Sequence, residues 1–192
     1  MITRIFRGKL VVIGDQGVGK TALLNMFVSD GREYPKNYTM TFAPEVSIKL
    51  VHIPNTNDAV ELIIYDCPGI DLYSDLLNKF WNGPDLLMVV FDLTNKNSLD
   101  SVANWISLTK KAKWRGNGGI PIASVLLGNK SDLENRLVCL GEEPVHVADR
   151  YNMKYFFGSV KNNQGLEDPF QFIADSFYKY SLKNYSEESR TI

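Results

Sequence analysis

The residues Gly14-Asp15-Gln16-Gly17-Val18-Gly19-Lys20-Thr21 follow the pattern G-x-x-x-x-G-K-[ST]. An apolar run rich in β-branched side chains, Lys9–Ile13, precedes them and predicts a buried strand, while Ala22–Phe27 has a helical pattern. In this setting a glycine-rich turn can bind phosphate, because its backbone N–H groups point inward at the positive end of a helix. The alternative is a tight turn that binds nothing. With its two flanking elements, the pattern predicts a phosphate-binding loop.

Each position of this loop has an expected role. Lys20 is expected to reach the β- and γ-phosphates of a nucleotide, and the Thr21 hydroxyl to ligate Mg²⁺. The other positions are expected to hold the phosphates, and they are Asp15, Gln16, Gly17, Val18 and Gly19.

Length and composition restrict the kinds of protein that this chain can be. Its 192 residues suffice for one domain, and 44% hydrophobic with 22% charged residues is typical of ordinary soluble proteins. A net charge of −1 gives no reason to expect a nucleic acid or an anionic membrane as partner. No apolar stretch approaches the ~18 residues of a membrane span, and the chain starts without a signal-peptide core. Its two cysteines indicate a reducing compartment.

Strand and helix patterns alternate along the chain. Strands are expected at Lys9–Ile13, Glu45–Ile53, Val60–Tyr65, Leu86–Phe91, Ile120–Leu127 and Lys154–Phe157. Helices are expected at Gly19–Ser29, Tyr73–Trp81, Ser98–Trp114, Glu142–Tyr151 and Leu166–Leu182.

The order of these elements predicts the fold class. Residues 54–58, Pro54-Asn55-Thr56-Asn57-Asp58, separate two strand runs and predict a hairpin turn, so one edge pair should be antiparallel. The remaining alternation predicts an α/β fold, with a six-stranded, mostly parallel sheet and helices on both faces. Residues 1–183 are expected to form one domain, and residues 184–192 a disordered polar tail.

A second motif follows the strand pattern that ends in Asp66. This carboxylate is placed to hold Mg²⁺ through water, and in the following Cys67-Pro68-Gly69 the Gly69 N–H can reach a γ-phosphate. An aspartate at a strand end followed by glycine is common. The motif gains meaning only from its distance after the phosphate-binding loop.

A third motif, Asn129-Lys130-Ser131-Asp132, distinguishes guanine from adenine. The Asp132 carboxylate can accept two parallel hydrogen bonds, from N1–H and the exocyclic amine of guanine, and adenine lacks that donor pair. The Lys130 stem can lie along the base, and Asn129 can brace neighbouring loops. Further on, Ser159-Val160-Lys161 follows a short strand pattern, and a backbone N–H there can bond guanine O6.

The motifs G-x-x-x-x-G-K-T, D-x-x-G, N-K-x-D and S-x-K in this order resemble those of the Ras-superfamily small GTPases, and among them the Rab-like branch. The resemblance extends from Lys9 to about Leu182. It implies binding of GTP, GDP and Mg²⁺, with Lys20, Thr41 and Gly69 acting on the γ-phosphate. It also implies that Thr41 ligates Mg²⁺ when GTP is bound, with Thr39 as the alternative, and that Tyr34 stacks on the guanine edge.

The chain departs from the usual family pattern at one catalytic position. Family members commonly have D-T-A-G-Q, where the glutamine orients the attacking water, and this chain has Ile70 instead. The isoleucine side chain makes no hydrogen bond, so slow intrinsic hydrolysis is expected. Faster hydrolysis is expected to need help from a GTPase-activating partner. Asp71 is an alternative water-positioning group with a shorter reach, and Pro68 should stiffen the loop.

A second departure concerns membrane attachment. Most Rab proteins end in prenylated cysteines, whereas the last cysteine here is Cys139, so no direct membrane anchor is expected. Lys79–Gly83, Tyr155–Phe157 and Ser176–Lys179 resemble segments of the Rab-like GTPases of intraflagellar transport. This resemblance implies a heterodimer with a small β-sandwich subunit of intraflagellar transport complex B, contacts with other complex B subunits, and a location in cytoplasm and cilium.

Three functional hypotheses remain. The chain is a GTP-dependent switch, a constitutive scaffold subunit that keeps nucleotide for stability, or a P-loop kinase or ATPase. The Asn129–Asp132 motif argues against the last, while Ile70 favours the scaffold. Among the tryptophans, Trp105 is expected in the core, and Trp81 is a candidate for either the core or a partner contact.

Overall fold

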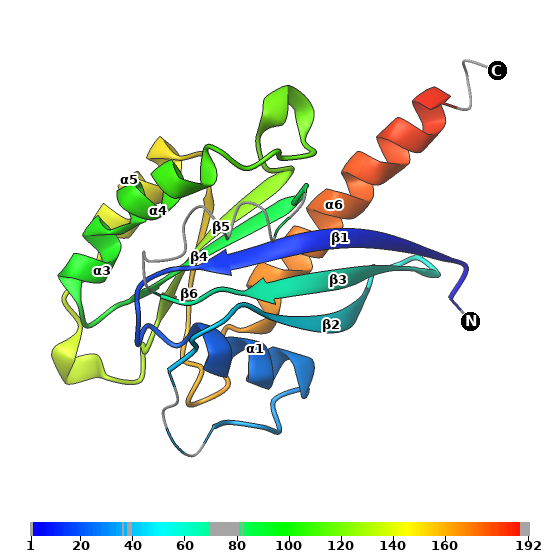
Figure 1. The fold of residues 1–192 in the computed structure, drawn as a ribbon. Helices are drawn as coiled ribbons and strands as arrows, with labels where there is room; N and C mark the ends of the chain where they lie inside the picture. The colour runs from blue at the N-terminus through cyan, green and yellow to red at the C-terminus, as the bar shows by residue number, and fades with distance from the viewer. Residues whose placement is uncertain (1, 36, 38–39, 70–80, 82, 189–192) are drawn as a thin grey trace.

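The computed structural model of the protein describes residues 2–35, 37, 40–69, 81 and 83–188. Within these ranges it contains a six-stranded sheet with the strand order β2-β3-β1-β4-β5-β6 (Figure 1). The strands are β1 (Arg4–Ile13), β2 (Glu45–His52), β3 (Asp58–Asp66), β4 (Leu86–Asp92), β5 (Ala123–Asn129) and β6 (Lys154–Phe157). The α/β fold predicted from the sequence is confirmed.

The predicted hairpin forms the antiparallel edge of this sheet. Strand β2 pairs with β3 in the antiparallel direction, and the other pairs are parallel. In the turn, the Ile53 N–H donates to the Asp58 carbonyl, and the Thr56 hydroxyl donates back to the Ile53 carbonyl at 2.9 Å. Strand β1 begins at Arg4, earlier than predicted, because its mostly exposed first half pairs with β3 from Asp58 onward.

Helices cover both faces of the sheet, as Figure 1 shows. Leucine, phenylalanine and methionine side chains of α1 and α6 bury one face, while α3, α4 and α5 contribute to a second core on the other face. These helices are α1 (Lys20–Val28), α3 (Lys96–Asp100), α4 (Val102–Thr109), α5 (Glu143–Arg150) and α6 (Glu167–Glu188). The predicted helix Tyr73–Trp81 lies outside the described residues except for Trp81.

Two helix predictions differ from the structure at their ends. The helix predicted for Ser98–Trp114 is divided into α3 and α4 and stops at Thr109, whose carbonyl accepts a hydrogen bond from Trp114 Nε1 at 3.0 Å. The chain therefore leaves the helix after Thr109, where the pattern predicted a continuous helix. At the other end, α6 continues to Glu188, so residues 184–188 are helical where an irregular tail was expected.

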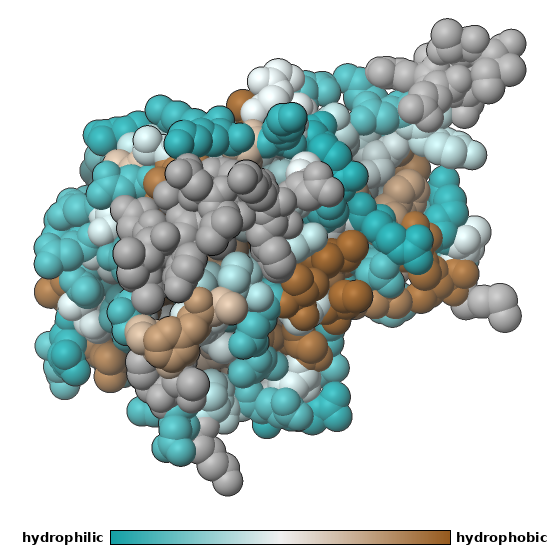
Figure 2. Space-filling model, viewed as in Figure 1, coloured by the Kyte–Doolittle hydropathy of each residue, from teal (hydrophilic) through white to brown (hydrophobic). Residues whose placement is uncertain are grey.

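The surface of the sheet is not covered evenly. Figure 2 shows apolar side chains gathered over the part of the molecule where β1 and β3 lie. On the edge strand β2, Val46 and Ile48 point to the same face and are 50% and 58% exposed. Among the described residues, no helix is both long and apolar enough to cross a membrane.

The topology brings the predicted motifs to one edge of the sheet. The carboxyl ends of parallel strands point the same way, and in such sheets ligands bind beyond these ends. The loops after β1, β3, β4 and β5 begin at Gly14, Cys67, Leu93 and Lys130. Segments more than a hundred residues apart therefore meet at this edge.

Candidate functional site

The phosphate-binding loop has the backbone that its glycines permit. Gly14 and Gly19 adopt φ angles of 141° and 102°, which other residues rarely adopt. A Cβ atom on Gly14 would overlap the Val90 carbonyl of β4, and one on Gly19 would overlap the Asn129 side-chain amide. These two glycines therefore let the loop lie directly against β4 and the start of the N-K-x-D motif.

Lys20 begins α1 and turns its ammonium back over the loop. Its Nζ donates to the carbonyls of Gly14 and Asp15, at 2.8 and 3.0 Å. The residue is buried, and burial lowers the pKa of the Lys20 ammonium, although nearby Asp66 acts in the opposite direction. A buried cation held at the mouth of such a loop is suited to an anionic group.

Thr21, Thr41 and Asp66 meet beside this lysine, as the motifs together with the family resemblance led us to expect. The Thr21 hydroxyl donates to Asp66 Oδ2 at 2.6 Å, and its oxygen lies 2.8 Å from Thr41 Oγ1. The rival position, Thr39, lies outside the described residues. Two hydroxyls and one carboxylate from three separate segments thus share one small volume.

One oxygen of Asp66 indicates whether a metal ion fits here. Its Oδ1 atom is buried and has no hydrogen-bond partner among the described residues, and burial raises the pKa of the carboxyl. An unsatisfied buried carboxylate oxygen is costly unless a ligand compensates it. Oxygen ligands of this kind suit Mg²⁺, so the three side chains fit a magnesium ion.

Gly69 lies against the same loop. A Cβ atom on this residue would overlap the backbone of Asp15 and Gln16, so only glycine allows the approach. The exposed Gln16 side chain donates to Met40 Sδ at 2.9 Å, and Met40 precedes Thr41 in the chain. Ile70, which stands at the position of the catalytic glutamine, lies outside the described residues. Asp71, the alternative water-positioning group, also lies outside them.

Two adjoining cavities run along the loop. One of about 200 Å³ is lined by residues that include Lys20, Thr21, Thr41 and Gly69. The other, of about 420 Å³, is lined by residues that include Tyr34, Asn129, Lys130, Asp132, Val160 and Lys161. Both have Gly17, Gly19 and Pro35 in their walls. The structure therefore gathers the predicted phosphate and base residues around neighbouring spaces.

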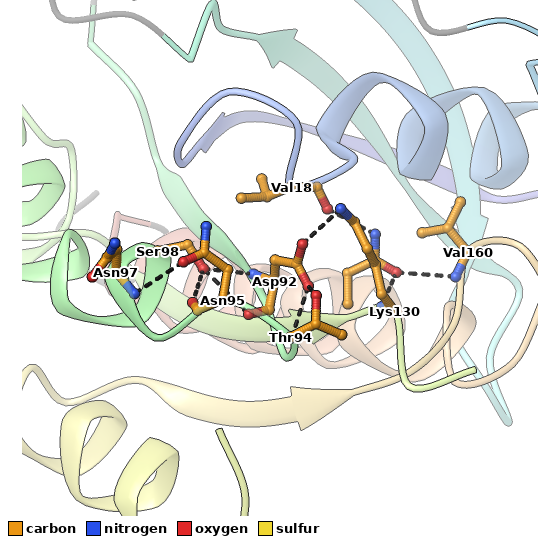
Figure 3. A network of polar contacts seen from close by, with 9 residues as sticks. Val18, Asp92, Thr94, Asn95, Asn97, Ser98, Lys130 and Val160 are labelled. Atoms are coloured by element: carbon orange, nitrogen blue, oxygen red, sulfur yellow. Dashed lines mark hydrogen bonds and ion pairs between the residues drawn. The ribbon is translucent and has the colours of Figure 1, made fainter. Parts of the chain in front are cut away.

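Asn129 braces the larger cavity. Its Nδ2 donates to the Val18 carbonyl at 2.8 Å, and its Oδ1 accepts from the backbone N–H groups of Lys130 and Val160 at 2.7 and 3.1 Å (Figure 3). The predicted bracing of neighbouring loops is thus visible in the contacts. The Val160 N–H is one candidate donor to guanine O6. It already donates to Asn129 Oδ1, so a bound base would have to share this donor with Asn129.

The Asp132 carboxylate is held by a hydrogen bond from Ser159. Ser159 is fully buried, and its hydroxyl donates to Asp132 Oδ1 at 2.6 Å. The hydroxyl therefore holds one carboxylate oxygen in place at the cavity wall. Such a fixed acceptor can read a pair of parallel donors.

Two further residues belong to the site that the sequence did not indicate as members. Asp92, at the end of β4, lies 2.6 Å from Lys130 Nζ, and Trp105 of α4 donates to Asp15 Oδ1 at 2.7 Å. Asp92 ends a buried strand just as Asp66 does, which was a usable signal. Trp105 had no such signal, because its pattern indicated only a core position.

Trp81 is part of the core. Its side chain is 1% exposed, and its Nε1 lies 3.3 Å from the Cys67 sulfur, to which it donates. Burial raises the pKa of the Cys67 thiol to about 12. The candidate role of Trp81 as a surface contact to a partner is therefore wrong, and the residue anchors the segment after Asp66 instead.

Known proteins resemble this chain over most of its length. Residues 9–179 match the model of the Ras family. The chain is 37% identical to intraflagellar transport protein 27 homolog from Mus musculus, over 89% of this chain and 90% of that protein. It is 35% identical to intraflagellar transport protein 27 from Chlamydomonas reinhardtii, over 97% and 90%, and 33% identical to Ras-related protein Rab-1 from Theileria annulata, over 95% and 79%.

Proposed function

The chain belongs to the Ras family, and from that premise we propose that it binds GTP and GDP with Mg²⁺ and acts as a nucleotide-dependent switch in ciliary transport. Members of this family are GTPases that bind guanine nucleotides and magnesium in general. The observation that carries the proposal is the meeting of Thr21, Thr41 and Asp66, with one buried Asp66 oxygen lacking a partner among the described residues.

In the proposed complex, the loop backbone of Asp15–Thr21 and the Lys20 ammonium bind the phosphates. Thr21 and Thr41 ligate Mg²⁺ directly, and Asp66 does so through water. The bound ion offsets charge on the phosphate oxygens. The buried, pre-positioned lysine supports this arrangement because its ammonium needs no reorientation to meet an anion.

Guanine occupies the larger cavity in this proposal. Asp132 accepts from N1–H and the exocyclic amine, while Tyr34 and the Lys130 stem line the space for the ring. The Ser159 hydroxyl on Asp132 supports this role because it keeps one carboxylate oxygen in a fixed direction. Backbone N–H groups at residues 159–161 are the candidate donors to O6.

Hydrolysis is proposed to be slow. The residue after Gly69 is Ile70, whose side chain cannot orient an attacking water, and Asp71 has a shorter reach than glutamine. Fast turnover would then need a group supplied by a GTPase-activating partner. Bound GTP would order the segments of Thr41 and Gly69, and hydrolysis would release them.

The relatives named intraflagellar transport protein 27 support a place in a ciliary transport complex. We propose a heterodimer with a small β-sandwich subunit of complex B, together with other complex B subunits, in the cytoplasm and the cilium. The exposed Val46 and Ile48 on β2 are consistent with a protein partner, because exposed apolar groups favour association.

The guanine assignment is tested by changing its acceptor. Asp132→Asn replaces one acceptor oxygen with a donor, which suits xanthine, where an oxygen replaces the exocyclic amine of guanine. The variant should bind GDP more weakly and xanthosine diphosphate more tightly than the wild type, measured by competition against a fluorescent nucleotide. Asp149→Asn, on the exposed side of α5, is the control and should change neither affinity. Unchanged base preference in Asp132→Asn would overturn the assignment.

The hydrolysis proposal is tested by single-turnover kinetics on protein loaded with GTP and Mg²⁺. Ile70→Gln should hydrolyse GTP faster than the wild type, since it restores a hydrogen-bonding group at that position. Ile120→Gln changes an isoleucine that is 56% exposed and lies outside both nucleotide cavities, so it should behave as the wild type. Fast wild-type turnover would refute slow hydrolysis and make Asp71→Asn the next variant.

A scaffold with bound but unused nucleotide is the second candidate, and Ile70 is the observation that favours it. The two candidates differ in how the partner responds. A switch binds its partner with different affinity in the GTP and GDP states, whereas a scaffold binds equally in both. Titration of complex B subunits against protein loaded with each nucleotide distinguishes them.

A further inference from the structure

Lys130 forms an ion pair that the N-K-x-D motif does not predict. The residue follows β5 and has a φ angle of 70°, an uncommon conformation for a side chain larger than glycine. From there its Nζ extends to Asp92 Oδ2, at 2.6 Å, across the edge of the sheet (Figure 3). Asp92 ends β4, the strand paired in parallel with β5, and pairs in register with Asn129.

The Asp92 carboxylate is itself held in place. Its Oδ1 accepts from the Thr94 N–H at 2.8 Å and from the Thr94 hydroxyl at 2.7 Å, while the Asp92 N–H donates to the Ser98 hydroxyl. Burial tends to raise the pKa of Asp92, but the bonds from Lys130 and Thr94 outweigh it and keep the pKa below its usual value. The group is therefore a fixed anion at neutral pH.

The lysine is consequently held at both ends. Its backbone N–H donates to Asn129 Oδ1 at 2.7 Å, and its ammonium is bound by Asp92. Lys130 lines the cavity that Asp132 and Tyr34 also line. A free lysine side chain has many rotamers, and restricting them before a ligand arrives lowers the entropy cost of binding.

We propose that Asp92 is a positioning residue for nucleotide binding, which acts by holding the Lys130 ammonium so that the lysine stem stays extended along the wall of the base cavity. This inference rests on the proposed function, because it takes the cavity as the guanine site. Asp92 does not touch the base in this arrangement. Its effect on binding passes entirely through Lys130.

The geometry favours this role over an ordinary surface ion pair. Exposed pairs contribute little, because solvent screens the charges and both side chains remain mobile. Here the Asp92 side chain is 11% exposed and the Lys130 side chain 32%. A matched comparison exists in Lys96 and Asp100, whose atoms are also 2.6 Å apart but whose side chains are 43% and 60% exposed.

The alternative is a purely structural role, in which Asp92 only shapes the turn through Thr94 and Ser98. A double-mutant cycle separates the two. Asp92→Asn removes the charge with little change of shape, and Lys130→Met keeps the stem but removes the ammonium. If Asp92 acts through Lys130, its substitution has no further effect once the ammonium is gone.

The measured quantity is the dissociation rate of a fluorescent GDP analogue, chased with excess GDP in Mg²⁺. Asp92→Asn should raise the rate by about twofold to about tenfold, the range expected for releasing one rotamer-rich side chain. Lys130→Met should raise it at least as much, and the double variant should match Lys130→Met alone. Asp100→Asn, the matched control, should dissociate at the wild-type rate.

Three outcomes overturn the inference while leaving the proposed function intact. They are an unchanged rate in Asp92→Asn, effects of the two single variants that multiply in the double variant, and a rate in Asp100→Asn raised as much as in Asp92→Asn. Far-ultraviolet circular dichroism of each variant in saturating GDP verifies that all are folded. Failure of the wild type to bind any guanine nucleotide is a different result, and it would refute the proposed function itself.

Discussion

Trp105 Nε1 donates a hydrogen bond to Asp15 Oδ1 at 2.7 Å, and this bond joins α4 to the phosphate-binding loop. The two residues are 90 positions apart in the chain. The Trp105 ring is 6% exposed and belongs to the core between α4 and the sheet. The loop is therefore fixed from three sides, by β4, by the Asn129 amide and by this indole.

Trp105→Phe should loosen the loop. The substitution retains an aromatic ring in the core but leaves the Asp15 carboxylate without its donor, and a hydrogen bond to a charged group contributes roughly 1.5–3 kcal/mol. We expect faster GDP dissociation together with a lower free energy of unfolding. Trp114→Phe is the control, because Trp114 Nε1 donates to the Thr109 carbonyl, away from the loop. It should lose stability in urea without faster GDP release, and equal release rates in both variants would contradict the interpretation.

Asp66→Asn should weaken Mg²⁺ binding without lowering the stability of the folded protein. Burial raises the pKa of Asp66 in the folded protein, so ionising this carboxyl costs stability, and the cost is complete once the pH exceeds the raised pKa. Without Mg²⁺ and nucleotide, stability should fall as the pH rises from the ordinary value of about 3.9 through the raised pKa. Asparagine removes this cost and can still accept from Thr21.

The variant should therefore be at least as stable as the wild type at neutral pH in EDTA. Its Mg²⁺ affinity should fall by about 10–100-fold, as for other groups that act on a metal through water. Urea unfolding in EDTA and Mg²⁺ titration of GDP retention measure the two effects. Lower stability of Asp66→Asn than of the wild type in EDTA would show that the buried carboxylate does not destabilise the folded protein.

Gly69→Ala should weaken the binding of GTP more than the binding of GDP. The added Cβ overlaps the backbone of Asp15 and Gln16, so the segment must move away from the loop and lose its proposed γ-phosphate contact. Loss of one charge-assisted hydrogen bond corresponds to about tenfold in affinity. Competition binding of both nucleotides measures the ratio.

The control is Gly141→Ala, a glycine with φ of 71° and open space around it. The left-handed backbone makes this change cost roughly 1–2 kcal/mol of stability, yet the ratio of GTP to GDP affinity should stay unchanged. A ratio altered equally in both variants would mean that lost stability, and not the loop contact, governs nucleotide preference.

Asp58 should make the fold sensitive to acid. The Arg4 guanidinium, with help from the Tyr178 hydroxyl, holds the pKa of the Asp58 carboxyl below its usual value. This stabilisation is complete above the unfolded pKa of about 3.9 and is lost as the pH falls through the lower folded value. Asp58→Asn should therefore be less stable at pH 7 and lose less of its remaining stability on acidification.

Urea unfolding at a series of pH values from about 7 down to about 3 measures this difference. Tyr178→Phe removes one of the two partners and should give an intermediate acid response. Parallel curves for the wild type and Asp58→Asn would mean that other carboxylates dominate acid unfolding.

The motifs that carry the site were readable from the sequence because each depends on a local pattern. The glycines of residues 14–19, Asp66 at a strand end and the Asn129–Asp132 motif have residue types and spacings that reflect the backbone they require. Parallel strands then place these segments at one edge without further information. The six strands follow from their apolar runs and the hairpin from its turn residues, whereas the division of the predicted helix at Ser101 and its end at Thr109 do not.

The partners of the side chains were decided by tertiary structure alone. Asp92 pairs with Lys130 because β4 and β5 are in register, and Trp105 reaches Asp15 because α4 packs at one particular place on the sheet. Likewise the contact between Thr21 and Thr41, which are 20 residues apart, forms only in the folded chain. The sequence by itself determined the motif residues that we assign to the site, since local patterns encode backbone shape, but it did not indicate Asp92 or Trp105. Which groups touch depends on register and helix packing, which arise only when distant segments fold together.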